Sequence, residues 1–160
     1  MAKYLTVFSD SHGQRRNVSS LYGDCFSSDK IVFLGDGLGD LIELFEFEDK
    51  TIKVAGNCDF TLRANKQAVF ELEGVKFLAV HGDLFGVKSS LDRLTDFAKQ
   101  TGVNAVLFGH THKPIIEKRD GITLINPGTL SNYGDRETFA FVTVKNGEVD
   151  AKIIPLVKRV

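Results

Sequence analysis

The chain has 160 residues, of which 42% are hydrophobic and 26% are charged, and its formal net charge is -1. These values predict one globular domain over residues 1–160 and exclude a disordered or strongly basic chain. We expect no membrane span and no signal peptide, and because Cys25 and Cys58 lack a paired spacing, we expect a reduced protein of the cytoplasm.

The first strand is expected at residues 4–8, where aromatic and β-branched residues dominate. Asp10 and His12 follow it two residues apart, so in an extended chain their side chains would lie on the same side. The alternative role of Asp10 is to cap the next helix. That helix is expected over residues 14–22, and Gly23 is expected to end it.

A second buried strand, residues 31–34, runs into the segment Gly-Asp-Gly-Leu-Gly-Asp. A dinucleotide-binding loop would need a third glycine where Asp40 stands and would follow the first strand, so we reject that interpretation. Instead, Asp36 presents a carboxylate at the end of a strand. A helix is expected over residues 38–47, with an apolar face formed by Leu38, Leu41, Ile42 and Phe45.

The third strand, residues 51–55, is followed by Asn57, which either ligates a metal through its amide oxygen or occupies a left-handed turn. Residues 68–72 and 75–80 flank a Glu-Gly pair and predict a hairpin. The second strand of this hairpin runs into His81, which alone would more often be structural than a ligand.

Ser89 is expected to cap the next helix, with Asp92 three residues later, and Gly102 is expected to end that helix. Its inward face is expected to comprise Leu91, Leu94, Phe97 and Ala98. Two further hairpins are expected, 115–118 with 122–125 and 138–144 with 149–154.

The strand that ends at Phe108 is followed by His110 and His112. In an extended chain these two imidazoles would face one point, as two metal ligands do, and the alternative is a pair of ordinary loop histidines. The histidine count favours a shared site, because each of the four histidines follows an apolar strand-like run within five residues.

Seven polar residues thus follow apolar strands, and the carboxyl ends of strands in α/β sheets converge on one crevice. They would suffice for two metal sites of about four ligands each if the Asp36 carboxylate, which has two oxygens, were shared. Imidazole, carboxylate and amide ligands suit Mn, Fe or Zn rather than Ca. The seven candidates are Asp10, His12, Asp36, Asn57, His81, His110 and His112.

Taken in order, these motifs resemble the calcineurin-like metallophosphoesterase superfamily. Within it, the chain is similar to the small phosphodiesterases of the YfcE type, which are relatives of the retromer subunit Vps29. The resemblance implies an α/β fold: a four-layer α/β/β/α sandwich of two mixed β-sheets flanked by helices. The motifs are Asp10-x-His12, Gly35-Asp36, Gly56-Asn57-Cys58-Asp59, His81-Gly82-Asp83 and Gly109-His110-Thr111-His112.

The resemblance also implies two divalent metal ions, for which we expect manganese, with iron, zinc and nickel as alternatives. A hydroxide that bridges the two ions would attack the phosphorus of a small phosphodiester. One ion would be held by Asp10, His12, Asp36 and His112, and the other by Asp36, Asn57, His81 and His110.

Three residues in or near these motifs either depart from the family pattern or have a role that the sequence does not decide. Cys58 stands where many members have a histidine, and a thiol with a pKa of about 8.5 replaces an imidazole poorly near neutral pH, so we expect weak activity on poor leaving groups. Asp59 either orients a ligand or caps a turn. Arg136 is a candidate for substrate binding, and the alternative is an ordinary surface arginine.

The alternative to an enzyme is a non-catalytic interaction protein with the same fold, as in Vps29. Since no expected ligand is missing, we favour the enzyme. A nuclease is a third interpretation, but the near-neutral charge and the lack of a stripe rich in lysine and arginine argue against long nucleic acids. The sequence leaves a homo-oligomer open.

Overall fold

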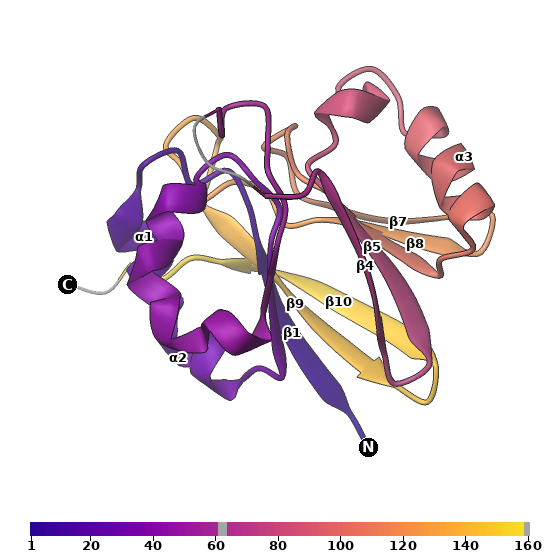
Figure 1. Ribbon diagram of the computed structural model, residues 1–160, viewed down its shortest axis with the longest axis horizontal. Helices are drawn as coiled ribbons and strands as arrows, with labels where there is room; N and C mark the ends of the chain where they lie inside the picture. The colour runs from indigo at the N-terminus through magenta and orange to yellow at the C-terminus, as the bar shows by residue number, and fades with distance from the viewer. Residues whose placement is uncertain (61–63, 159–160) are drawn as a thin grey trace.

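Two five-stranded sheets form the centre of the computed structural model, which describes residues 1–60 and 64–158 (Figure 1). In the first sheet, β1, β2 and β3 are parallel, and β9 and β10 add antiparallel strands beyond β1. Its order is β10 (Glu148–Pro155), β9 (Thr138–Lys145), β1 (Lys3–Phe8), β2 (Lys30–Phe33) and β3 (Thr51–Lys53).

The second sheet has three parallel strands, β5, β6 and β8, with antiparallel strands β4 and β7 at its edges. Its order is β4 (Gln67–Leu72), β5 (Val75–Val80), β6 (Ala105–Leu107), β8 (Ile122–Asn126) and β7 (Ile115–Arg119). The parallel strands are central in the second sheet, and in the first sheet they run from the centre, β1, to the edge, β3. The segments that follow them reach the same region of the molecule (Figure 1).

Side chains alternate between a core shared by the two sheets and two outer cores. Val7 of β1 and Phe77 of β5 lie in the shared core, whereas Phe8 and Leu78, their neighbours in the chain, face the outer layers. The helical segments α1 (Arg15–Ser19), α2 (Tyr22–Ser27) and η1 (Leu38–Lys50) cover the first sheet, and η2 (Asp83–Phe85) and α3 (Asp92–Thr101) cover the second. The predicted four-layer sandwich of two mixed sheets is therefore confirmed.

The helix expected over residues 38–47 is present as η1, which consists of 3-10 turns interrupted by a kink, with non-helical backbone angles at Leu44 and Phe47. A 3-10 turn has about three residues, so the buried positions do not follow the α-helical stripe that was expected. Ile42 and Phe45, which were expected to face the core, are 57% and 69% exposed. Leu38 and Leu41 are buried as predicted, and the other buried apolar positions are Leu44 and Phe47.

Two other helix boundaries also differ from the prediction. The single helix expected over residues 14–22 is divided into α1 and α2, and Gly23 lies inside α2 rather than ending a helix. Ser89 does not cap α3; the hydroxyl oxygen of Ser90 accepts the N–H of Asp92 instead. Gly102 ends α3 in the left-handed conformation, as predicted.

The three predicted hairpins are all present, and their turns explain why they could be predicted. Each turn places two residues at positive φ, which two-residue hairpin turns of type I′ require. The pairs are Glu73-Gly74, Asp120-Gly121 and Asn146-Gly147. Among the helices of residues 1–60 and 64–158, none is both long enough and apolar enough to cross a membrane.

Candidate metal centre

Six of the seven predicted ligands come together at the ends of four parallel strands. Asp10 and His12 follow β1, and Asp36 follows β2. His81 follows β5 directly, and the His110 and His112 pair follows β6. The cluster therefore draws on both sheets and lies where the central strands end.

Backbone conformation, rather than strand alternation, brings these side chains together. Five of the residues have a left-handed backbone, so the extended geometry expected for the two pairs of residues spaced i and i+2 is wrong. A left-handed non-glycine residue costs of order 1–3 kcal/mol, and such residues concentrate at functional sites. The five are Asp10 (φ 56°), His12 (φ 43°), Asp36 (φ 61°), His110 (φ 70°) and His112 (φ 63°).

One half of the cluster surrounds a buried carboxylate oxygen. Oδ1 of Asp10 lies 3.2 Å from Nε2 of His112, 3.6 Å from Nε2 of His12 and 3.8 Å from Nε2 of His81. Within the described ranges 1–60 and 64–158, the buried side-chain atoms without a hydrogen-bond partner are this oxygen and Nε2 of His12. Three imidazole nitrogens facing one orphaned oxygen are the arrangement that a bound divalent cation would satisfy.

The other half contains Asp36, His81 and His110. Nε2 of His81 lies 3.2 Å from Oδ2 of Asp36 and 3.2 Å from Nδ1 of His110. Nδ1 of His81 is 2.7 Å from the carbonyl oxygen of Leu34, to which it can only donate a hydrogen bond. In the neutral ring this contact leaves the lone pair on Nε2, where a metal ion would take it.

The cluster holds its carboxylates ionised and attracts positive charge. Burial opposes ionisation of Asp10, but the nearby imidazoles of His112 and His12 outweigh it and lower the pKa of this carboxyl well below its usual range. The pKa of Asp36 is likewise lowered, against the effect of burial, by its contacts with His81 and the backbone of Cys58. The nearby Asp10 carboxylate raises the pKa of His12.

Asp36 lies between the two halves. Its Oδ1 accepts the N–H of Cys58 at 2.8 Å. Its Oδ2 lies 3.7 Å from Nε2 of His12 and 3.2 Å from Nε2 of His81. Oδ2 of Asp36 therefore faces an imidazole of each half of the cluster.

Asn57 and Cys58 lie at the exposed side of the cluster. Sγ of Cys58 is close enough to His12 and Asp36 to form a third candidate group with them. Burial and the Asp36 carboxylate raise the pKa of the Cys58 thiol, which is therefore protonated at neutral pH. The amide nitrogen of Asn57 is 3.5 Å from this sulfur, and its role as a ligand stays a prediction.

Asp59 positions the backbone of the loop that carries Asp36. Its Oδ2 accepts the N–H groups of Asp36 (2.7 Å) and Gly56 (2.8 Å), and its Oδ1 accepts those of Gly37 (3.0 Å) and Leu38 (3.1 Å). Asp59 thus orients the Asp36 loop and also caps the start of η1, so both proposed roles describe the same contacts.

Three further residues, which were not predicted, hold the backbone of the cluster in position. Asp40 accepts hydrogen bonds from the Ser11 hydroxyl at 2.6 Å and the Gly13 N–H at 2.8 Å, on either side of His12. Asn126 donates to the Gly109 carbonyl and the Thr111 hydroxyl, both at 3.0 Å, and Thr129 donates to the Asp10 carbonyl at 2.8 Å. Each contact joins segments distant in sequence, so no local pattern could have indicated it.

Arg136 is exposed and lines a cavity of about 360 Å³ beside His112. Tyr133 lines the same cavity, and its ring meets the His12 ring edge-on with 5.5 Å between their centroids. Burial, together with the charges of His81 and Lys88, lowers the pKa of His110.

The fold and this cluster form a candidate metal centre, and comparison with known proteins identifies the family. The model of the calcineurin-like phosphoesterase superfamily domain matches residues 4–147. The chain belongs to this superfamily.

Among curated relatives, a probable metallophosphoesterase of Mycoplasma pneumoniae is 33% identical over 133 residues, which are 81% of this chain and 80% of the relative. Phosphodiesterase YfcE of Escherichia coli K12 is 26% identical over an alignment that covers 95% of this chain and 83% of that protein. The chain spans 66% of the length of a probable metallophosphoesterase of Methanocaldococcus jannaschii, to which it is 28% identical.

Solved structures support the same fold. A predicted phosphoesterase from Streptococcus pneumoniae superimposes with a TM-score of 0.83 at 24% identity, covering 97% of this chain and 90% of that one. Vps29 from Cryptosporidium parvum superimposes with a TM-score of 0.78 at 13% identity, covering 96% and 97%. At these identities the likeness concerns the fold alone.

Proposed function

We propose that this protein is a metal-dependent phosphodiesterase that hydrolyses a small phosphodiester at a centre of two divalent ions. The observation that carries the proposal is Oδ1 of Asp10, a buried carboxylate oxygen without a hydrogen-bond partner in the described part of the chain, faced by three imidazole nitrogens. The names of the relatives, metallophosphoesterase and phosphodiesterase, point to the same chemistry.

The proposed ligands form two groups around Oδ2 of Asp36. One group comprises Asp10, His12 and His112, and the other comprises His81 and His110. We assign Asn57 to the second group from the resemblance to the family. When bound, a pair of divalent cations supplies an activated water and electrostatic stabilisation of the phosphoryl oxygens. We propose manganese as the activating ion in vitro, since nitrogen and oxygen donors of this kind suit it.

The protein's own contribution is to hold these donors in the required protonation states and positions. The Leu34 carbonyl fixes the tautomer of His81. The N–H of His110 and the hydroxyl of Ser9 hold Oδ2 of Asp10, which leaves Oδ1 directed into the cluster. Since Cys58 is a neutral thiol with a raised pKa, it gives little help to a poor leaving group.

An interaction protein without catalysis remains the rival, because Vps29 shares this fold. The two proposals differ in what the substitution Asp36→Asn does. Asparagine keeps an oxygen that can accept the Cys58 N–H but removes the negative charge shared by both groups. An enzyme would lose turnover and metal affinity, whereas a scaffold would keep its partner.

The test removes bound metal with a chelator, restores Mn²⁺, and measures hydrolysis of bis(p-nitrophenyl) phosphate by the wild type and by Asp36→Asn. Asp49→Asn, at an exposed position of η1, is the matched control. We expect recovery of activity in the wild type and in the control, and at least about a hundredfold lower activity in Asp36→Asn. Failure of Mn²⁺, Zn²⁺, Fe²⁺ and Ni²⁺ to restore any hydrolysis would refute the enzyme.

A further inference from the structure

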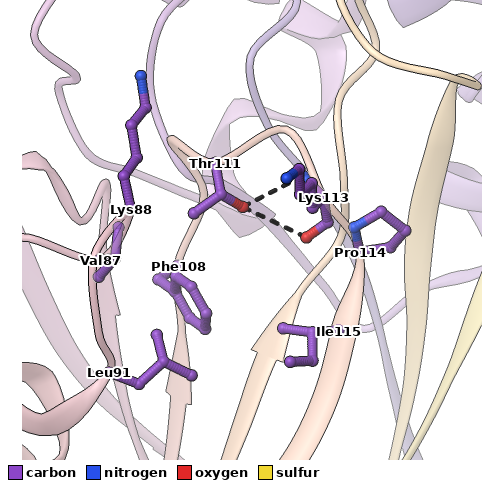
Figure 2. Close-up of a pocket in the computed structure, with 8 residues that line it drawn as sticks. All are labelled: Val87, Lys88, Leu91, Phe108, Thr111, Lys113, Pro114 and Ile115. Carbon is purple, nitrogen blue, oxygen red and sulfur yellow. Dashed lines mark hydrogen bonds between the residues drawn. The ribbon is translucent and has the colours of Figure 1, made fainter.

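A cavity of about 550 Å³ opens between the segment that precedes α3 and the edge of the second sheet (Figure 2). Its wall is mainly apolar and is formed by Val87, Leu91, Phe108 and Ile115. Three of these side chains are at most 8% exposed, so the wall is part of the packed structure and is not a loose surface. This volume falls within the usual range for sites that bind small molecules.

The cavity adjoins the candidate metal centre at three points. Thr111, which lines it, stands between His110 and His112. Phe108, which also lines it, directly follows β6 and precedes His110 by two residues. Val87 packs directly on the backbone beside His81, because a methyl group added to Gly82 would lie 2.9 Å from Cγ2 of Val87.

The rim of the cavity is basic. Lys88 and Lys113 both line it and both are exposed. Neither ammonium group forms an ion pair with any residue in the ranges 1–60 and 64–158. The Thr111 hydroxyl, by contrast, is fully engaged with the backbone of Lys113 and the amide of Asn126, so the lysines are the polar groups that can meet a ligand (Figure 2).

We propose that this cavity holds an organic arm of the substrate, and that this arm is apolar or aromatic. The inference rests on the proposed phosphodiesterase function and names the class of substrate: a phosphodiester whose ester group is a planar ring, such as an aryl or nucleobase-sized group. The ring lies against the apolar wall, and the two lysines at the rim neutralise negative charge on the phosphate or on a further anionic substituent.

Two neighbouring isoleucines of β7 provide a matched pair of variants. Ile115 lines the cavity and is 36% exposed, whereas Ile116, which does not line it, is 43% exposed and lies on the opposite face of the strand. At such exposure, asparagine is tolerated at either position with a similar cost in stability. Only Ile115→Asn places a polar group in the proposed ring site.

The experiment compares the inhibition constants of 1-naphthyl phosphate and methyl phosphate against hydrolysis of bis(p-nitrophenyl) phosphate by the Mn²⁺-loaded protein. Both compounds are phosphate monoesters, and they differ only in the organic group that is esterified. We expect the naphthyl ester to bind at least about tenfold more tightly in the wild type and in Ile116→Asn, and this advantage to fall at least about threefold in Ile115→Asn.

The lysines are tested with the same two ligands. Lys88→Gln and Lys113→Gln should weaken both esters alike, by about two- to fivefold, whereas Lys118→Gln, at an exposed position on β7 outside the cavity, should weaken neither. A loss confined to the naphthyl ester would contradict the role assigned to the lysines.

Two other outcomes separate this inference from the function on which it rests. If the protein hydrolyses the diester but binds the naphthyl and methyl esters equally, or if Ile115→Asn and Ile116→Asn behave alike, the ring site is refuted and the phosphodiesterase stands. If no divalent ion restores hydrolysis, the proposed function is refuted, and the substrate class inferred from it is refuted as well.

Discussion

Replacing Asp59 by alanine removes a carboxylate that accepts four backbone N–H groups without belonging to the metal cluster. A hydrogen bond to a charged acceptor contributes about 1.5–3 kcal/mol. Because Asp59 is partly exposed, water can replace the carboxylate at some of these amides, and we expect a net loss of about 2–4 kcal/mol in the free energy of unfolding. For a chain of this size, the melting temperature would fall by roughly 5–15 °C.

The same substitution should weaken metal binding, because one of the four N–H groups belongs to Asp36. We expect the affinity for Mn²⁺ to fall about 10- to 100-fold, as it does when groups that support metal ligands are removed. Asp59→Asn should be nearly as harmful as alanine. Its single oxygen can serve only one pair of N–H groups, and its amide nitrogen would then face the other pair.

The assays are thermal unfolding of the metal-free variants by circular dichroism and Mn²⁺ titration calorimetry well below their melting temperatures. Asp150→Ala, at an exposed position of the edge strand β10, is the control and should match the wild type in both. The reasoning would be refuted if Asp59→Ala unfolded within about 0.5 kcal/mol of the wild type, or if it lost stability but bound Mn²⁺ with unchanged affinity.

Three further predictions concern single residues of the same region and the two thiols. Gly56→Ala should abolish Mn²⁺ binding in calorimetry, because the new methyl group would lie 2.1 Å from Oδ1 of Asp36; unchanged affinity would show that this close approach is unnecessary. Cys58→His should raise turnover of diesters with alkyl leaving groups by about tenfold or more while leaving bis(p-nitrophenyl) phosphate little changed, and equal effects on both substrates would argue against a missing proton donor. A thiol-specific reagent at mildly alkaline pH should label exposed Cys58 in the folded protein, but Cys25 only after unfolding, because burial raises the pKa of Cys25 to about 12; mass spectrometry of labelled peptides distinguishes the two.

The parts of the fold that could be predicted from the sequence are those set by local chemistry. The pair Asn146-Gly147 adopts the two positive φ angles that a tight hairpin turn needs. Because few residue types tolerate these angles, an Asn-Gly pair between two apolar runs can be recognised from the sequence alone. The same holds for Gly102 at the end of α3. The buried strands could be located for a similar reason, since β-branched and aromatic runs mark them.

The parts that could not be predicted depend on competition between alternatives that the sequence leaves close in energy. Both Leu44 and Phe45 could face the core in segment 38–50, and it is Leu44, at the kink between the 3-10 turns, that is buried. The positioning roles of Asp40 and Asn126 depend on contacts with backbone groups 27 and 17 residues away, respectively, which only the folded chain defines.

The central claim is that the cluster binds two divalent ions that share Asp36. A crystal of the protein grown with Mn²⁺ and phosphate, measured at the manganese absorption edge, tests it most directly. We predict two anomalous peaks, one among Asp10, His12 and His112 and the other beside His81 and His110, with Oδ2 of Asp36 between them. The account would be contradicted if a crystal saturated with Mn²⁺ showed no anomalous peak in the cluster, or only a single peak far from Asp36.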